Sequence, residues 1–230
     1  MRPGHLALAA GATAWCAPAL APHATRLCRP LRISRTLPPG SRDVALTFDD
    51  GPHPVGTPAV LETLRAHGAK ATFFLIGEQV ERYPALTKEI ADAGHGIALH
   101  GYRHRNLMRI PPPVLRDDLH RAHTLIANVT GHAPTVYRPP YGIFSPAGLR
   151  IARREGWEPM LWSKWGTDWR KFIRPETIAR RVTTGVVPGD VLLLHDADHY
   201  SAKDSHLRTA AALPLVLDEL QRRNLRSVAL

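Results

Sequence analysis

The chain has 230 residues, 44% of them hydrophobic and 22% charged, and this ordinary globular composition excludes wholesale disorder and a collagen-like repeat. Thirty Lys and Arg against twenty Asp and Glu give a net charge of +10, but the basic residues are dispersed, so we expect no nucleic-acid partner and rather a basic surface that associates with an anionic cell envelope. The two cysteines are too few for a disulfide framework or a thiolate metal site.

The N-terminal region divides into a leader and a linker. Residues 1–25 include an uncharged, alanine-rich stretch that resembles a signal peptide, while a disordered leader and an uncleaved membrane anchor stay open as alternatives. Residues 26–42 are basic and contain proline without apolar periodicity, which is typical of a linker that catalysis does not need. The sequence thus predicts a secreted or envelope protein, or a cytoplasmic one if the leader is not a signal, with one domain over residues 43–230.

Strands alternate with helices from residue 43 onward. Short β-prone runs predict strands over residues 44–48, 71–76, 96–99, 135–137, 159–162, 191–194 and 226–230. Helical periodicity covers residues 57–67, 78–93, 113–130, 146–155, 175–184 and 207–223. This alternation predicts an α/β fold with a parallel sheet, either doubly wound or closed into a barrel.

Polar residues that could carry chemistry follow these strands. They are Asp49 and Asp50, His100, Arg138, Asp168 and His195. Because active sites of parallel α/β folds gather at the carboxyl ends of the strands, we expect these side chains to meet at one edge of the sheet.

Some of these polar residues are candidate ligands of a metal ion. Asp49 and Asp50 leave a strand in different directions, so one could bind a metal and the other act as a base, although a solvated Asp-Gly turn is the alternative. His100 and His104 are spaced i, i+4, which brings two imidazoles to one side of a helical turn. Together with Asp50 they offer two imidazoles and a carboxylate, a set that leaves positions open for water and substrate.

The remaining candidates would bind substrate or move protons. Arg138 opens a proline-rich loop, where it could hold a carboxylate while free backbone N–H groups meet an oxyanion. His195 ends an apolar strand, and a general acid of near-neutral pKa would be useful there; a hydrogen-bonded core histidine is the alternative. Around Asp168 stand three indoles that could bind a sugar or simply be buried, namely Trp162, Trp165 and Trp169.

Five segments in order resemble the motifs of the polysaccharide deacetylases, the carbohydrate esterases that share the NodB homology domain. The segments are Thr47-Phe48-Asp49-Asp50-Gly51-Pro52, His100-Gly101-Tyr102-Arg103-His104, Arg138-Pro139-Pro140-Tyr141, Asp168-Trp169 and Leu193-Leu194-His195. The resemblance implies a distorted (β/α)7 barrel, a divalent metal ion, usually zinc with cobalt as a second candidate, and removal of N-acetyl groups from an N-acetylglucosamine-containing polysaccharide such as peptidoglycan or a chitin-like chain.

The same resemblance implies a role for each matching residue. Asp50, His100 and His104 would bind the metal. Asp49 would be the general base and His195 the general acid. The supporting roles would be orientation of Asp49 by Arg138, tuning of His195 by Asp168, oxyanion binding by the backbone at Tyr141, and enclosure of the acetyl methyl group by Trp169 and Leu193.

Two positions depart from the family pattern. Gly101 follows His100 where the family usually has Ser or Thr, and Trp165 stands where an aspartate often begins the fourth motif. The second departure bears on substrate preference and keeps open a metal-dependent amidohydrolase of a small N-acyl compound or cyclic amide. A non-catalytic carbohydrate-binding relative on the same barrel is a further alternative. We expect a monomer in each case.

Overall fold

The computed structural model describes residues 16–230, whose eight strands form one parallel sheet. The strands are β1 (Val44–Asp49), β2 (Thr72–Leu75), β3 (Gly96–Leu99), β4 (Val136–Tyr137), β5 (Glu158–Pro159), β6 (Lys164–Trp165), β7 (Val191–His195) and β8 (Ser227–Val228). Their order is β5-β4-β3-β2-β1-β7-β6, and β8 pairs with the start of β1. Strand β1 is central, so residues at its carboxyl end are flanked by β2 and β7.

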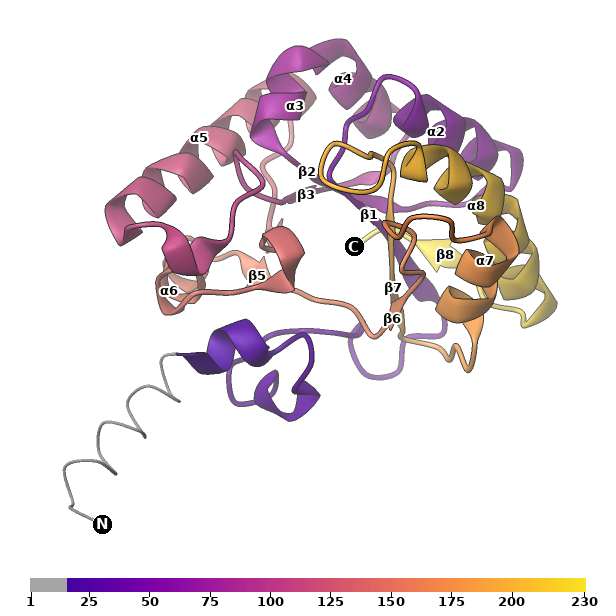
Figure 1. Ribbon diagram of the computed structural model, residues 1–230, viewed down its shortest axis with the longest axis horizontal. Coiled ribbons are helices and arrows are strands. Elements are labelled where there is room, and N and C mark those ends of the chain that lie inside the picture. Colours follow the sequence, from indigo (N-terminus) through magenta and orange to yellow (C-terminus); the bar gives the residue numbers. More distant parts are fainter. Residues whose placement is uncertain (1–15) are drawn as a thin grey trace.

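Seven helices surround the curled sheet (Figure 1). They are α2 (Gly56–Ala66), α3 (Gly77–Arg82), α4 (Pro84–Asp92), α5 (Pro112–Thr130), α6 (Pro146–Arg154), α7 (Pro175–Thr183) and α8 (Ser205–Arg222). The predicted α/β architecture, a distorted barrel, is confirmed, with β5 and β6 as the two ends of the hydrogen-bonded strand order. Strands β1 and β2 are buried along their whole length, which explains their nearly continuous apolar sequence.

Two predicted elements differ from the structure, and one strand, β6, was not predicted. The helix predicted over residues 78–93 is two helices, α3 and α4, which meet at Tyr83. Tyr83 precedes Pro84, and a residue before proline is disfavoured in the helical region, so its ψ of 55° breaks the helix. Strand β5 begins and ends earlier than predicted, and β6 has only two residues, too few for a recognisable alternation.

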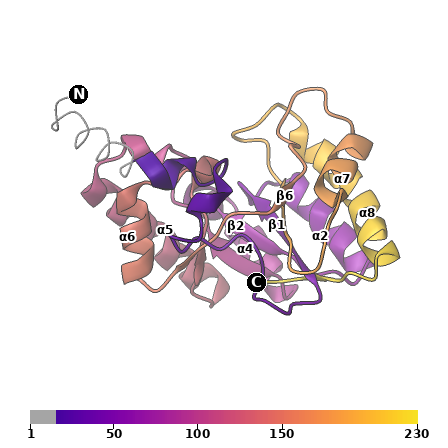
Figure 2. The same cartoon turned by 90° about the horizontal axis from the view of Figure 1, so that it is seen from below.

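The segment over residues 26–42 packs against the barrel (Figure 2). Ser34 forms a parallel bridge with Met160 next to β5, and Thr36 an antiparallel bridge with Asp190 next to β7. Cys28 and Ile33 are buried in the hydrophobic core. This differs from the expectation of a linker, because isolated bridges and single buried side chains leave no periodic pattern in the sequence.

The predicted leader is described only in part. Residues 1–15 lie outside the described residues, whereas Ala21 is fully buried against the domain. Between residues 16 and 230 we find no helix with both the length and the apolar character needed to cross a bilayer. Among the described residues, both cysteines, Cys16 and Cys28, are free thiols, in line with the expectation of no disulfide framework.

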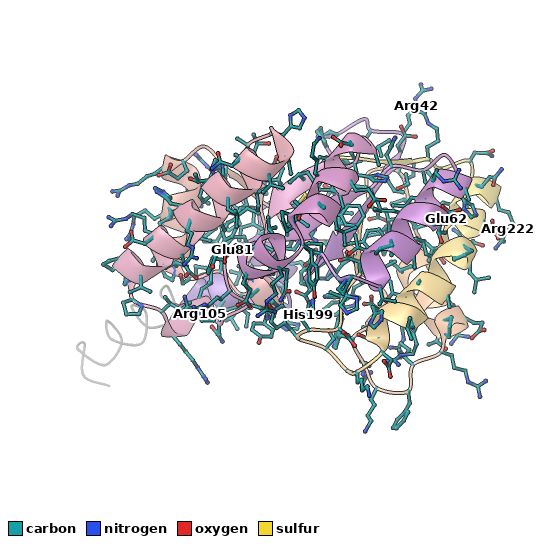
Figure 3. All side chains as sticks on the ribbon, turned by 90° about the horizontal axis from the view of Figure 1, so that it is seen from above. Arg42, Glu62, Glu81, Arg105, His199 and Arg222 are labelled. Carbon is teal, nitrogen blue, oxygen red and sulfur yellow. The ribbon has the colours of Figure 1, made fainter. Side chains whose placement is uncertain are left out.

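Charged side chains are distributed over the surface (Figure 3). In this view Arg42, Arg105 and Arg222 lie far apart, with Glu62 and Glu81 among them. Several of the exposed arginines pair with acids, as Arg226 does with Asp43 at 2.9 Å. Ion pairs of this kind neutralise part of the basic charge locally.

Candidate active site

A cleft of about 400 Å³ opens at the carboxyl ends of the strands. Eight of the ten predicted site residues line it: Asp49, Asp50, His100, His104, Tyr141, Trp169, Leu193 and His195. The other two, Arg138 and Asp168, are fully buried behind the lining and reach it through hydrogen bonds. The sheet register brings Asp49 directly beside His195, since β1 and β7 pair in parallel there.

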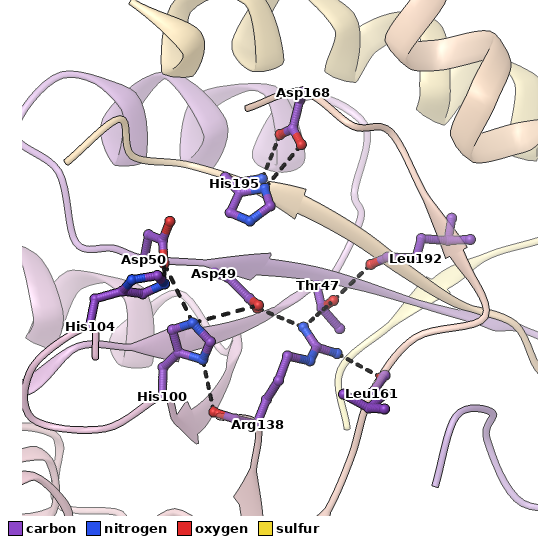
Figure 4. Close-up of polar contacts among 10 residues, drawn as sticks. All are labelled: Thr47, Asp49, Asp50, His100, His104, Arg138, Leu161, Asp168, Leu192 and His195. Carbon is purple, nitrogen blue, oxygen red and sulfur yellow. Dashed lines mark hydrogen bonds and ion pairs between the residues drawn. The ribbon is translucent and has the colours of Figure 1, made fainter. Parts of the chain in front are cut away.

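Arg138 holds the first aspartate from behind (Figure 4). Its Nη1 donates to Asp49 Oδ1 at 2.6 Å and to Thr47 Oγ1 at 3.0 Å, and its Nη2 donates to the carbonyl oxygen of Leu161 at 3.0 Å. The guanidinium also lies 3.8 Å above the ring of Phe74. One carboxylate oxygen of Asp49 is thus fixed by a charge-assisted bond, which leaves Oδ2 for the cleft.

Asp50, His100 and His104 converge on one point (Figure 4). His100 Nε2 lies 3.4 Å and His104 Nε2 lies 3.3 Å from the same oxygen, Asp50 Oδ1. Asp50 has a φ of 79°, a left-handed conformation that aspartate tolerates and that turns it away from the direction of Asp49. One ligand atom from each residue can be chosen so that all lie within 4.8 Å of one another.

Hydrogen bonding shows that this set fits a cation. His100 Nδ1 lies 2.8 Å from the carbonyl oxygen of Arg138, which can only accept, so Nδ1 carries the proton and the lone pair of Nε2 faces Asp50. Asp50 Oδ1 and His104 Nδ1 are buried without a hydrogen-bond partner. An imidazole lone pair and a carboxylate oxygen repel each other unless a cation lies between them, and that is the chemistry of a metal-ligand set.

The protonation states point the same way. Burial lowers the pKa of His104 to about 4, so this imidazole is neutral at neutral pH. Burial alone would raise the pKa of Asp50, but the contact with His100 and, at the acidic pH where this carboxyl titrates, the charges of protonated His104 and His195 outweigh burial and hold this pKa below its ordinary value. Neutral imidazole and ionised carboxylate are the forms that bind metal ions.

His195 is paired with the buried carboxylate of Asp168 (Figure 4). Its Nδ1 lies 3.0 Å from Asp168 Oδ1, and its backbone N–H donates to Asp168 Oδ2 at 2.7 Å. Thr209 Oγ1 donates to the same Oδ2 at 2.7 Å. Burial lowers the pKa of His195, yet the charge and hydrogen bond of Asp168, with smaller help from Asp50 and Asp49, outweigh burial and raise it to about 10.

Two loop residues of the site have left-handed backbone conformations. Tyr141 has a φ of 60° in the turn after Arg138, and its ring packs edge-on against His104 at 4.3 Å. Gly101 has a φ of 108°, a conformation that side chains rarely adopt. The glycine that departs from the family pattern after His100 therefore suits the backbone of this loop.

The wall beside His195 is a row of indoles. Trp169 packs edge-on against His195 with ring centroids 5.4 Å apart, and Trp165 packs against Trp169 at 5.6 Å. Trp162 lies 5.6 Å from Trp165 and closes the row behind it. Trp165 and Trp169 are only half-buried, so the predicted aromatic cluster presents indole surface to the cleft.

Four lining residues were not among the sequence candidates, namely His23, Gly142, Tyr200 and Ser201. Tyr200 stacks on His104 with ring centroids 4.3 Å apart and an interplanar angle of 9°. Its hydroxyl donates to Glu78 Oε1 at 2.6 Å and accepts from Gln79 Nε2 at 3.1 Å, which ties the loop after β7 to α3. Tyr200 carries no sequence signal for this role except its position five residues after His195.

Asp196 supports the loop that carries the aspartates. It is fully buried and accepts a short hydrogen bond from Thr57 Oγ1. A Cβ atom at Gly51 would lie 2.4 Å from Asp196 Oδ2, so only glycine fits this close approach. Burial raises the pKa of Asp196 to about 7.

A second histidine-rich cluster lies nearby, at His53, Asp198 and His199. His53 Nδ1 accepts hydrogen bonds from the backbone N–H groups of Val55 at 3.2 Å and Gly56 at 3.0 Å. Its proton must then be on Nε2, 3.4 Å from Asp198 Oδ1, where it is a donor to the carboxylate rather than a metal ligand. This cluster stabilises the loop and is not part of the candidate site.

The arrangement has the parts of a hydrolytic site for an amide. It combines a fixed carboxylate, a cation-ligand set and the imidazole of His195 in the lining of one cleft. Among the described lining residues, Ser201 is the only serine or cysteine, and no hydrogen bond joins it to His195.

Proteins of similar sequence are polysaccharide deacetylases. The family model described as polysaccharide deacetylase matches residues 36–160. A peptidoglycan-N-acetylglucosamine deacetylase of Bacillus cereus is 36% identical over 194 residues, which cover 84% of this chain and 68% of the relative. A chitooligosaccharide deacetylase of Azorhizobium caulinodans is 34% identical over 187 residues, covering 78% of this chain and 89% of the relative.

A solved structure shares the fold at similar identity. It is a peptidoglycan N-acetylglucosamine deacetylase in complex with a naphthalenyl N-oxidanyl-benzamide, with a TM-score of 0.80 and 33% sequence identity. The match covers 86% of this chain and 91% of that chain.

Proposed function

The chain belongs to the polysaccharide deacetylase family, and from this membership and the geometry of the cleft we propose that it removes N-acetyl groups from N-acetylglucosamine units of a polysaccharide. It is a hydrolase that acts on carbon–nitrogen bonds other than peptide bonds. The observation that carries the proposal is the placement of Asp49 and His195 side by side on β1 and β7, next to the ligand set of Asp50, His100 and His104.

The ligand set would hold one divalent cation. Two imidazoles and a carboxylate suit zinc, and cobalt accepts the same ligands, so we propose zinc with cobalt as the second candidate. When bound, the cation polarises the acetamido carbonyl oxygen and lowers the pKa of a water molecule. The protein fixes the two histidine ligands, His100 through the Arg138 carbonyl and His104 through the stacked Tyr200.

Asp49 would act as the general base. Its Oδ1 is held by Arg138, so Oδ2 is the oxygen that accepts the proton of the attacking water. As the water oxygen bonds to the acetamido carbon, the carbonyl oxygen gains negative charge. We assign the backbone N–H of Tyr141 to this oxyanion, because Tyr141 lines the cleft beside His104.

His195 would act as the general acid. The carbon–nitrogen bond breaks as Nε2 of the imidazolium gives its proton to the departing nitrogen, so that acetate and a free amine are released. Asp168 keeps His195 protonated and correctly turned. Trp169 and Leu193, both in the cleft lining, would enclose the acetyl methyl group.

The substrate class follows from the relatives and the aromatic wall. The relatives are named peptidoglycan-N-acetylglucosamine and chitooligosaccharide deacetylases, so we propose peptidoglycan or a chitin-like chain as the substrate. The half-buried indoles beside His195 give the apolar faces on which sugar rings are commonly bound.

The test compares three substrates in one assay of acetate release: N-acetylglucosamine oligomers, purified peptidoglycan, and small cyclic amides. The proposal expects acetate from at least one of the first two and no hydrolysis of the cyclic amides. Hydrolysis of only the cyclic amides would identify a small-amide hydrolase on the same barrel. Sugar binding without turnover in a metal-loaded protein would identify a non-catalytic relative.

We further propose that the protein is secreted or held at the cell envelope, where such polymers occur, and acts as a monomer. The buried Ala21 favours a mature chain that keeps this part of the predicted leader. Cell fractionation with the N-terminal mass of the mature protein tests this; recovery of the intact chain in the cytoplasm would overturn the proposed location.

A further inference from the structure

His23 reaches the mouth of the cleft from outside the barrel. It belongs to the N-terminal segment, ahead of the residues 36–160 that the family model matches. Its imidazole lies 6.3 Å from Trp165 between ring centroids, at an interplanar angle of 59°. The cleft is thus lined by an N-terminal residue that precedes the first strand of the barrel as well as by residues of the barrel itself.

The segment that carries His23 is anchored on both sides. Ala21 is fully buried, and the Cys28 thiol donates to its carbonyl oxygen at 3.5 Å. Arg153 Nη2, at the end of α6, donates to the Leu31 carbonyl oxygen at 2.6 Å. The backbone of Ser34 accepts from Leu161 N at 2.8 Å and donates to a carbonyl of β5 at 2.9 Å. Figure 2 shows this indigo segment lying between α6 and β6.

A row of aromatic contacts connects His195 with His23. His195 contacts Trp169 at 5.4 Å, Trp169 contacts Trp165 at 5.6 Å, and Trp165 contacts His23 at 6.3 Å. His23 is exposed and Trp165 is half-buried, so both have surface free for a ligand. His23 and Trp165 therefore follow Trp169 in this row, and Trp169 is the indole that we assign to the acetyl group.

We propose that His23 and Trp165 form a subsite for the sugar unit that adjoins the deacetylated one, an inference that rests on the proposed function. The indole face suits the C–H face of a pyranose ring. The imidazole, with one donor and one acceptor nitrogen, suits a hydroxyl or acetamido group at its edge. The ligand class is an uncharged N-acetylhexosamine unit within an oligomer, and the subsite sets a preference for oligomers over a single sugar.

The experiment compares kinetics on the single sugar N-acetylglucosamine with kinetics on its tetramer. His23→Ala, Trp165→Ala and the double variant are measured beside His132→Ala, which removes an exposed histidine that does not line the cleft. For His23→Ala we expect KM for the tetramer to rise about tenfold, as for loss of one hydrogen bond and its packing, with kcat and the KM for the single sugar unchanged. An unchanged tetramer KM, or an equal rise for both substrates, would overturn the subsite.

Direct binding separates this inference from the proposed function. Tetramer affinity is measured by calorimetry on the parent, His23→Ala and His132→Ala proteins, without any need for turnover. A roughly tenfold weaker Kd in His23→Ala alone supports the subsite even if no acetate is released, a result that would overturn only the proposed function. Equal Kd values in all three proteins would overturn the subsite even if the enzyme is active.

The two side chains should also act together. If His23 and Trp165 bind the same sugar unit, the loss of binding free energy in the double variant should be smaller than the sum of the losses in the two single variants. Additive losses would show that the two residues act independently and would overturn their assignment to one subsite.

Discussion

Arg138 and Asp49 form an ion pair that is closed to solvent, with Nη1 and Oδ1 2.6 Å apart and side-chain exposures of 0% and 4%. The pair joins the start of the loop after β4 to the end of β1, on opposite sides of β2 and β3 in the sheet order. Asp49 therefore cannot turn away from the cleft without leaving a buried guanidinium unpaired. This contact fixes the oxygen that we assign as the base.

Replacement of the Asp49 carboxylate by an amide is expected to stop the reaction but to preserve the fold and the metal ligands. Asp49→Asn preserves the shape of the side chain but cannot accept a proton, so kcat should fall about 100- to 10,000-fold. Metal content and thermal melting are measured alongside to show that the ligand set and fold remain. Activity within a few-fold of the parent would assign the base to another group.

Loss of either histidine ligand is expected to empty the metal site. His100→Ala and His104→Ala should each lower bound zinc from about one ion per chain to near zero after dialysis, because each removes one of only three protein ligands. Elemental analysis of the purified proteins checks this, with His132→Ala as the matched control. Full metal content in the variant that lacks both histidines would place the metal elsewhere.

The alkaline limb of the pH–rate profile is expected to depend on Asp168. Burial lowers the pKa of His195, and Asp168 with smaller effects of Asp50 and Asp49 raises it to about 10, so the acid stays protonated well above neutral pH. In Asp168→Asn the main raising charge is gone, and the alkaline limb should move to lower pH by about one to three units. Both proteins are assayed with the same metal.

An alkaline limb that is identical in the two proteins would contradict the assignment of His195 as the acid under the control of Asp168. Restoration of the parent's profile by Asp168→Glu, which keeps the charge, would separate this electrostatic role from a merely structural one.

The N-terminal segment is expected to contribute to stability. A chain that begins at Ser41 lacks Ala21, Cys28 and Ile33, which are buried in the full protein. Burial of one Ile side chain is worth about 1.5–3 kcal/mol, so the shortened chain should lose at least that much free energy of unfolding. Urea unfolding of chains that begin at Cys16 and at Ser41 checks this. Equal unfolding free energies would show that the segment is the dispensable linker that its sequence suggests.

Most of the fold and of the reacting groups can be predicted from the sequence because both leave regular signals. Strand β3 is a continuous apolar run with the predicted bounds, and helix α6 has periodic apolar residues. Asp49, His100 and His195 lie at or next to strand ends in a parallel fold. The metal ligands add a spacing that is itself meaningful, since His100 and His104 are four residues apart.

The remaining features depend on contacts that have no local pattern. Strand β6 has two residues and is defined only by its pairing with β7. His23 and Tyr200 enter the cleft from segments without regular structure, and each is identified only by its neighbour, Trp165 or His104. Burial of Cys28 and Ile33 likewise follows from the bridges at Ser34 and Thr36, which no periodicity announces.

The central claim, that this cleft hydrolyses the acetamido group of a sugar polymer, is tested most directly by the products formed from the N-acetylglucosamine tetramer. With metal-loaded protein, acetate and free amine should appear in equal amounts, and Asp49→Asn should form neither at a comparable rate. The account would be contradicted by acetate release without new amine, or by equal rates of product formation in Asp49→Asn and the parent. It would also be contradicted by a tetramer that stays unchanged after prolonged incubation.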